Sequence, residues 1–257
     1  MTMSKVSLPL ATLMQPPLTL LIDCDNTLVL SEHLAFAGCA TLINRLLSQH
    51  GISRTYTGAE LESRFVGQNF RGILASLSAD HGLSLPPTDV DVLATAEVET
   101  VLALLRTSLL PAPGAAAALA RAQPHATLAV VSSSAARRVH VSLQTAGLAA
   151  LFGPRVYSAA SSLPVPSSKP DPAVYLHAMV KLGVPPAECV AVEDSRSGVV
   201  AAVRAGIATL GYVGALQPAE REAAAEKLSE AGAAEIMYEW SEFGACLAKM
   251  GHPLASA

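Results

Sequence analysis

Charged residues are scarce in this sequence: they make up 15% of its 257 residues, and the formal net charge at pH 7 is -4. The chain therefore lacks the basic footprint that binds a nucleic-acid backbone or an anionic membrane surface. No apolar run approaches the roughly 18 residues that are needed to span a bilayer. We expect small-molecule partners, with no nucleic acid and no membrane.

Cysteine is also scarce. The four cysteines are Cys24, Cys39, Cys189 and Cys246, and they form no CxxC pair and no zinc-ligand spacing. Because each lies in an apolar segment, we expect small core residues in a reducing, cytoplasmic compartment.

Residues 1–17 lack the charged start, long apolar core and cleavage site of a secretion signal, so we expect a loose leader segment there.

An apolar run over residues 18–22 stops abruptly at Asp23 and Asp25, two acids one residue apart. Such a run is typical of a buried parallel strand. In open α/β sheets, ligands bind at the carboxyl ends of the strands. Because two neighbouring carboxylates repel each other, the pair indicates a metal ion or a catalytic role, and a plain turn after the strand is the structural alternative.

Residues 31–106 have a helical pattern and contain no convincing strand. Helices are expected at about 31–49, 61–65, 69–81 and 89–105, with Ser31, a Thr57/Glu60 capping box, Asn69 and Thr88 at their starts. The pattern predicts a helical insertion directly after the first strand.

From about residue 111 onward, apolar runs alternate with helices, which is the signature of a doubly wound parallel sheet. Strands are expected at 127–131, 156–158, 189–192, 207–211 and 236–238, and helices at 115–122, 135–146, 172–182, 198–205, 218–230 and from 241. The predicted fold is α/β, with a Rossmann-like core formed by residues 1–30 and 107–257 and a small all-helical cap formed by residues 31–106.

Polar residues follow three of the other predicted strands. Ser132 and Ser133 stand where a strand meets a helix N-terminus, a geometry that suits an anion, with helix capping as the alternative. Lys169 lies in a stiff, proline-flanked loop, where a solvated lysine is the alternative. Glu193 and Asp194 end an apolar strand, and paired carboxylates of this kind suit Mg²⁺, with helix capping again the alternative.

The order of these groups resembles the haloacid dehalogenase superfamily, specifically its phosphatase and phosphosugar-mutase branch with a helical cap after the first motif. The resemblance covers nearly the whole chain, and its four motifs are Asp23-Cys24-Asp25-Asn26-Thr27-Leu28, Ser132, Lys169-Pro170 and Glu193-Asp194. Asn26 stands where the family usually has glycine. Asparagine tolerates this position because it enters left-handed backbone conformations more readily than most residues.

The resemblance implies phosphoryl transfer through a covalent aspartyl-phosphate. Asp23 would be the nucleophile that attacks phosphorus. Asp25 would donate a proton to the leaving alkoxide and later take one from the attacking water. Ser132, Ser133 and Lys169 would bind the phosphoryl oxygens, whose charge grows in the transition state.

The resemblance also implies a Mg²⁺ cofactor. The carboxylate of Asp23, the backbone carbonyl of Asp25 and the carboxylate of Asp194 would hold the ion, with Glu193 as a direct or outer partner. The metal would offset the repulsion between an anionic nucleophile and an anionic phosphate.

In this branch, a loop of the cap closes over the active site and helps to choose the substrate. The matching positions here are Gly67, which permits a bend, and Gln68, Asn69 and Arg71, which are expected to reach the non-phosphate part of a substrate. The structural alternative is a helix stop at Gly67, a cap at Asn69 and an exposed Arg71.

The leading hypothesis is a cytoplasmic, Mg²⁺-dependent phosphatase for a small phosphorylated metabolite such as a sugar or polyol phosphate, active as a monomer or weak dimer. A phosphosugar mutase uses the same residues and is the alternative. A dehalogenase is disfavoured, because that branch has no second carboxylate where Asp25 stands. A phospho-accepting signalling domain also combines acids, a hydroxyl and a lysine, but it is roughly half this length and has no helical insertion.

Overall fold

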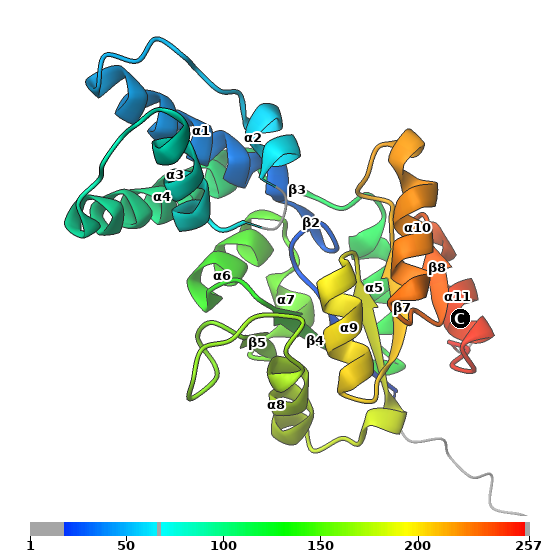
Figure 1. Cartoon of the computed structure of the whole chain (residues 1–257). Coiled ribbons are helices and arrows are strands. Elements are labelled where there is room, and N and C mark those ends of the chain that lie inside the picture. Colours follow the sequence, from blue (N-terminus) through cyan, green and yellow to red (C-terminus); the bar gives the residue numbers. More distant parts are fainter. Residues whose placement is uncertain (1–17, 66–67, 255–257) are drawn as a thin grey trace, which may run out of the picture.

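The computed structural model describes residues 18–65 and 68–254, and a six-stranded parallel sheet lies at its centre (Figure 1). The strand order is β5-β4-β1-β6-β7-β8. The strands are β1 (Leu18–Ile22), β4 (Ala126–Ser132), β5 (Val156–Ser158), β6 (Cys189–Glu193), β7 (Ala208–Tyr212) and β8 (Glu235–Met237). The predicted α/β, doubly wound core is confirmed, and β1 lies in its middle between β4 and β6.

Buried side chains of β1 alternate between two apolar cores, because successive residues of a strand point to opposite faces of the sheet. Leu20 and Ile22 belong to one core and Leu21 to the other. The first face is covered by α5 (Ala115–Ala122), α6 (Ala136–Thr145), α7 (Ala149–Phe152) and α11 (Phe243–Lys249). The second face is covered by α8 (Ala173–Leu182) and α9 (Arg196–Arg204), with α10 (Arg221–Glu230) packed beside α9. Short 3-10 turns cover Pro186–Glu188, Pro218–Glu220 and Trp240–Glu242.

Four helices lie between β1 and α5 in the sequence and share an apolar cluster. They are α1 (Glu32–Gln49), α2 (Gly58–Arg64), α3 (Phe70–Asp80) and α4 (Pro87–Ser108), and they form the predicted all-helical cap above the carboxyl edge of the sheet (Figure 1). The capping box of Thr57 and Glu60 is confirmed. The predicted start of α4 at residue 89 is wrong: Pro87 occupies the first turn, where its missing N–H leaves no hydrogen bond unmade. None of the helices in the described part of the chain is long and apolar enough to cross a membrane.

A short antiparallel ribbon connects the cap to the sheet. It pairs β2 (Val29–Leu30) with β3 (Leu110–Pro111), so that Leu30 lies opposite Leu110. The ribbon was not predicted, because two residues are too few to show an alternating pattern. It brings the two ends of the helical segment side by side.

Candidate active site

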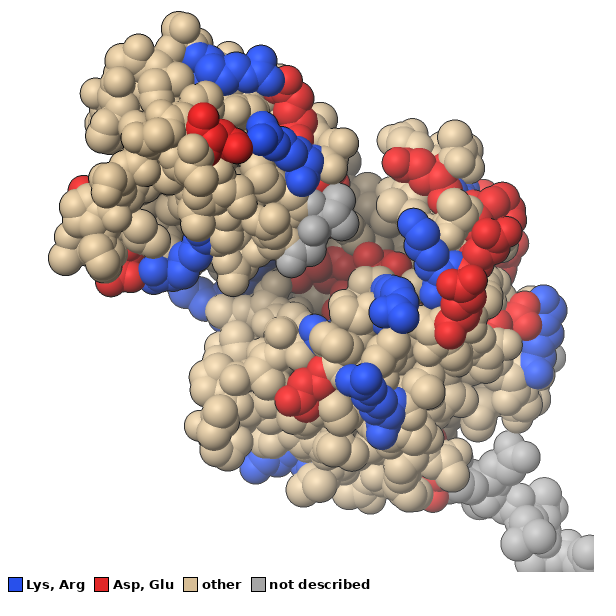
Figure 2. All heavy atoms as spheres, viewed as in Figure 1, with Lys and Arg blue, Asp and Glu red and all other residues tan. Residues whose placement is uncertain are grey.

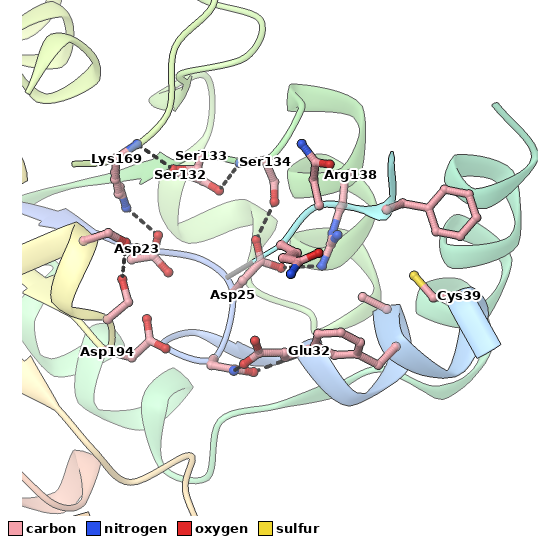
Figure 3. A pocket seen from close by; sticks show the side chains of 18 of the residues that line it. Asp23, Asp25, Glu32, Cys39, Ser132, Ser133, Ser134, Arg138, Lys169 and Asp194 are labelled. Atoms are coloured by element: carbon pink, nitrogen blue, oxygen red, sulfur yellow. Dashed lines mark hydrogen bonds and ion pairs between the residues drawn. The ribbon is translucent and has the colours of Figure 1, made fainter. Parts of the chain in front are cut away.

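The carboxyl ends of β1, β4 and β6 lie next to one another, because β1 pairs with both of the other strands. Asp23 follows β1, Ser132 ends β4, and Asp194 follows β6, while Lys169 comes from the loop before α8. Figure 3 shows these four side chains gathered around one space, and all four line the same cleft. The structure therefore brings together the groups that the strand-end pattern singled out.

Lys169 joins the two acidic ends of the site. Its buried Nζ atom lies 2.5 Å from Oδ1 of Asp23 and 2.5 Å from Oε1 of Glu193, and it also donates to the carbonyl of Val131 at 2.8 Å. Burial alone would lower the pKa of Lys169, but the two carboxylates raise it above its ordinary value. The lysine is therefore a fixed positive charge between two acids.

Glu193 has no exposed surface and lies beneath the cleft. Its Oε1 atom accepts hydrogen bonds from Lys169 and from the hydroxyl of Tyr175. Its Oε2 atom has no hydrogen-bond partner among the described residues and faces the backbone of Gly198. Burial, followed by the negative charge of Glu193, raises the pKa of Tyr175 well above its ordinary value, so this hydroxyl remains a donor.

Three carboxylates form the candidate metal centre: oxygen atoms of Asp23, Glu193 and Asp194 lie within 4.8 Å of one another. Burial raises the pKa of Asp23 to about 7, although the charge of Lys169 opposes this rise. Burial and the two neighbouring acids raise the pKa of Asp194 well above its ordinary value. A divalent cation would relieve this repulsion, and carboxylate oxygens are the ligands that Mg²⁺ and Ca²⁺ take, so these residues fit such an ion.

Asp25 accepts three hydrogen bonds from side chains on other elements. The donors are the hydroxyl of Ser31 at 2.5 Å, the hydroxyl of Ser134 at 2.7 Å and the guanidinium of Arg138 at 3.2 Å. Burial would raise the pKa of Asp25, but the charge of Arg138 and the two hydroxyls together hold it below its ordinary value. Ser31 occupies the predicted N-cap position of α1, but its hydroxyl donates to Asp25 and makes no capping hydrogen bond to the helix.

The hydroxyls of Ser132 and Ser133 shape the loop after β4. Ser132 Oγ accepts from the N–H of Ser134 at 3.0 Å, and Ser133 Oγ accepts from the N–H of Lys169 at 3.1 Å (Figure 3). Both serines line the cleft. The second bond ties the lysine loop to the end of β4 and so fixes the position of the Lys169 backbone.

The turn after the first acid pair is held by its own side chains. Asn26 adopts a left-handed conformation with φ of 54°, as the substitution of the usual glycine by asparagine predicted. Its side chain donates to Glu32, and the buried Thr27 hydroxyl donates to Asp194 at 3.2 Å. The indole N–H of Trp240 donates to the carbonyl of Thr27 at 3.2 Å, which anchors this turn to the far end of the chain.

The expected cap loop is only partly at the cleft. Gln68 and Asn69 line it, and Asn69 also caps α3 by accepting from a backbone N–H at 3.0 Å. Arg71 does not line the cleft, because its guanidinium lies 2.7 Å from the carboxylate of Asp91 in an exposed ion pair within the cap. Gly67 lies outside the described residues.

The cleft has a volume of about 590 Å³ and lies between the cap and the sheet, where Figure 2 shows a hollow with acidic side chains inside it. Besides Gln68 and Asn69, its cap wall includes Glu32, Ala35, Phe36, Cys39, Phe70, Ile73 and Glu97. No motif marks these seven as site residues, because they lie at ordinary helical spacings in α1, α3 and α4. With Arg138, they are the functional candidates that the motifs missed.

An α/β sheet with acids, a serine and a lysine at its carboxyl edge, covered by a helical cap, is the architecture of a hydrolase that acts at that edge. The family model described as haloacid dehalogenase-like hydrolase matches residues 18–206. The chain belongs to this family. Its relatives include several proteins named as phosphatases, and they support the class of phosphoric monoester hydrolases.

Three comparisons illustrate the relationship. The 6-phosphogluconate phosphatase of Escherichia coli K12 is 30% identical over 185 residues, which are 72% of this chain and 77% of the relative. The validoxylamine A 7'-phosphate phosphatase of Streptomyces hygroscopicus subsp. limoneus is 32% identical over 193 residues, 74% and 83% of the two chains. A haloacid dehalogenase family hydrolase from Deinococcus radiodurans R1, solved with bound phosphate and sodium, is 30% identical with a TM-score of 0.71, covering 94% of this chain and 99% of that one.

Proposed function

We propose that this protein is a Mg²⁺-dependent phosphatase that hydrolyses a small sugar or polyol phosphate through a covalent aspartyl-phosphate on Asp23. The observation that carries the proposal is the shared position of Asp23, Lys169 and Asp194 at one edge of the sheet, with a buried ion pair of 2.5 Å between Asp23 and Lys169. The phosphatases among the relatives act, by name, on phosphorylated sugar derivatives and related compounds, which supports the substrate class.

In the first step, a carboxylate oxygen of Asp23 attacks phosphorus while the bond from phosphorus to the substrate oxygen breaks. Asp25 gives its proton to the departing alkoxide. In the second step, a water molecule attacks the phosphorus of the aspartyl-phosphate while Asp25 takes a proton from that water. The bond between phosphorus and the Asp23 oxygen breaks, so inorganic phosphate leaves and the Asp23 carboxylate is restored. Lys169 and Ser132 hold the phosphoryl oxygens throughout, as donors aimed at the charge that develops there.

Asp25 must change partners to act as the acid. In the structure it accepts from Ser31, Ser134 and Arg138, which favour its ionised form. For proton donation it must exchange at least one of these contacts for the leaving oxygen of the substrate. The pKa of Asp25 then rises, because a donor to its ionised form is lost and an anionic phosphate is near.

A bound Mg²⁺ would supply the positive charge that lets an anionic carboxylate approach an anionic phosphate. The carboxylates of Asp23 and Asp194 and the backbone carbonyl of Asp25 would hold it. Glu193 fits an outer position better, because its Oε1 atom is already engaged by Lys169 and Tyr175 and its Oε2 atom faces the backbone of Gly198. The role of Glu193 is then to hold the lysine in place.

We further propose that residues 31–106 act as a cap on a core formed by residues 1–30 and 107–257. The separate apolar cluster of the four cap helices supports this division. Gln68 and Asn69, which line the cleft, are proposed to select the substrate, and Arg71 is not, because Asp91 holds its guanidinium. The four cysteines are free and buried, which supports a reducing, cytoplasmic location, and we expect a monomer or weak dimer there.

A panel of phosphorylated metabolites with Mg²⁺ tests the proposal, with release of inorganic phosphate as the readout. Asp23→Asn and Asp25→Asn should each lower turnover by about 1,000-fold or more, and Asp23→Asn should form no covalent phosphate adduct. Asp89→Asn removes the same charge at an exposed position of α4 and should retain full activity. Conversion of a hexose 1-phosphate into its 6-phosphate isomer without phosphate release would identify a mutase instead.

A further inference from the structure

The cleft has two chemically different ends. Asp23, Lys169 and Asp194 form the end at the sheet, while Cys39 lies across the cleft from them (Figure 3). The thiol of Cys39 donates to Oε1 of Glu97 at 3.9 Å, so Glu97 belongs to the same side as Cys39. We call the set Phe36, Cys39, Phe70, Ile73 and Glu97 the distal wall, because it faces the part of a substrate that is remote from its phosphate.

The described residues that line the cleft include two cations, and both are already paired. Lys169 is engaged by Asp23 and Glu193. The guanidinium of Arg138 forms an ion pair with Asp25 through one terminal nitrogen at 3.2 Å, and its buried Nε atom has no hydrogen-bond partner among the described residues. Arg71 is drawn away from the cleft by its own ion pair. Within the described residues, each cation that lines the cleft therefore already has a carboxylate partner.

The negative charge of the distal wall comes from Glu97. Its only hydrogen-bond donor among the described residues is the thiol of Cys39, a weak one. Burial raises the pKa of the Cys39 thiol to about 12, so the sulfur remains protonated and neutral. Burial also raises the pKa of Glu97, against the lowering effect of Arg138, as expected for a half-buried carboxylate with one weak donor.

The rest of the distal wall is apolar. Phe36, Phe70 and Ile73 are buried side chains from α1 and α3 that also belong to the apolar cluster of the cap. A mainly apolar wall with one polar group is typical of a pocket in which that group fixes the orientation and identity of the ligand. The carbon skeleton of a sugar or polyol fits against such a wall, and its hydroxyl groups are hydrogen-bond donors.

On the basis of the phosphatase function proposed above, we propose that Glu97 restricts the substrate to phosphomonoesters whose remote end is a neutral polyol or carries an ammonium group. A hydroxyl or ammonium donates to the Glu97 carboxylate and supplies the donor that this group lacks. A carboxylate or a second phosphate at the same place meets a like charge with no free cation to offset it. Bisphosphates and phosphorylated sugar acids are therefore poor substrates.

Three six-carbon 6-phosphates that differ in charge at the remote end test this inference: glucosamine 6-phosphate, glucitol 6-phosphate and 6-phosphogluconate. We expect the wild-type protein to prefer the amine and the neutral polyol over the acid in kcat/KM. Glu97→Gln keeps the size of the side chain and removes the charge. It should raise kcat/KM for the acid about tenfold and lower it for the amine about tenfold, since each interaction with a full charge is replaced by one with a dipole.

The matched control is Asp89→Asn, which removes one negative charge from the same helix at an exposed position away from the cleft. It should leave the ratio of the amine to the acid unchanged. The wild-type protein and Asp89→Asn should hydrolyse p-nitrophenyl phosphate, whose remote nitro group carries no net charge and no hydrogen-bond donor, at the same rate. Release of phosphate from this compound by Glu97→Gln shows that the variant is folded and active.

Two results would overturn the inference while leaving the proposed function intact: a wild-type preference for 6-phosphogluconate, or an amine-to-acid ratio that changes less than about threefold in Glu97→Gln. Absence of phosphate release from every compound, including p-nitrophenyl phosphate, would instead overturn the proposed phosphatase function and this inference with it. The aryl phosphate therefore separates the two failures.

Discussion

Gly198 of α9 leaves room for the carboxylate of Glu193: a Cβ atom at position 198 would lie 1.7 Å from Oε2 and 2.2 Å from Cδ of this glutamate. The glutamate cannot easily retreat, because it has no exposed surface and its other oxygen is held by Lys169 and Tyr175. A glycine in a helix is ordinarily a cost, so its presence here follows from this close approach.

Gly198→Ala should therefore destabilise the protein, although alanine is the better helix former. We expect a loss of about 1–3 kcal/mol in the free energy of unfolding from overpacking, together with reduced turnover as Glu193 displaces Lys169. Gly244→Ala in α11 is the matched control, since a Cβ atom there meets nothing within 4 Å. It should be neutral or stabilising by up to about 1 kcal/mol. Chemical denaturation and phosphate release measure both effects, and equal behaviour of the two variants would contradict the packing argument.

The metal-free protein should lose stability as the pH rises toward neutrality. The pKa of Asp23 is about 7 in the folded protein against an ordinary value of 3.8, so between these values the folded state holds a proton that the unfolded chain has released. Stability from this group is full at low pH and is lost as the pH rises through about 7. A divalent cation binds the ionised carboxylates and should reverse the loss.

Thermal unfolding with EDTA or with saturating Mg²⁺ measures this linkage. We expect Mg²⁺ to raise Tm by about 5 °C or more at about pH 8 and by much less at about pH 5.5, where Asp23 holds its proton. Asp23→Asn cannot ionise, so its response to Mg²⁺ should be small and depend little on pH. A Tm increase of the same size at both pH values in the wild-type protein would count against the assigned metal centre.

Arg138 should set the upper pH limit of catalysis. Its charge is the largest influence that lowers the pKa of Asp25, so Arg138→Gln should raise that pKa. Because the general acid must be protonated, the alkaline limb of kcat/KM for an alkyl phosphate should move to higher pH, by roughly one pH unit. Hydrolysis of p-nitrophenyl phosphate, whose leaving group needs no proton, should show no such shift.

The neighbouring Arg137 provides a matched control for this experiment. Its guanidinium forms an exposed ion pair with Glu99 of α4 and does not line the cleft. Arg137→Gln should leave the pH profile unchanged and alter stability by less than about 1 kcal/mol. If both variants shift the alkaline limb equally, the shift comes from the loss of one positive charge anywhere on the protein, and the contact between Arg138 and Asp25 does not cause it.

The substrate preference of the cap loop should depend on Gln68 more than on Arg71. Gln68 lines the cleft, whereas the guanidinium of Arg71 is held by Asp91. Gln68→Ala should therefore change the relative kcat/KM values across a panel of sugar phosphates by about threefold or more, and Arg71→Ala should keep their order. The reverse outcome would mean that Arg71 leaves Asp91 when a substrate is bound.

The convergence of Asp23, Ser132, Lys169 and Asp194 could be predicted from the sequence because a topological rule requires it. The carboxyl ends of neighbouring parallel strands meet at one edge, so polar residues that end three apolar runs must come together. The helices of the cap were likewise predictable from apolar spacing and from caps such as Thr57 and Asn69, whose partners lie three residues away.

The partners of Asp25 could not be predicted in this way. Ser31 and Ser134 stand at positions where a local rule predicts helix capping, but a buried carboxylate competes for their hydroxyls, and Ser134 is 109 residues from Asp25. Arg138 and Glu97 lie within helices that carry no motif.

Because Leu30 pairs with Leu110, the chain leaves the sheet for the cap and returns to it at adjacent points. A segment whose two ends are adjacent can be lengthened, shortened or exchanged without moving the strands on which the reaction depends. The catalytic residues at the edge of the sheet and most of the proposed specificity residues in the cap can therefore evolve separately. New members of such a lineage can acquire new metabolites by remodelling one module while the other is inherited unchanged.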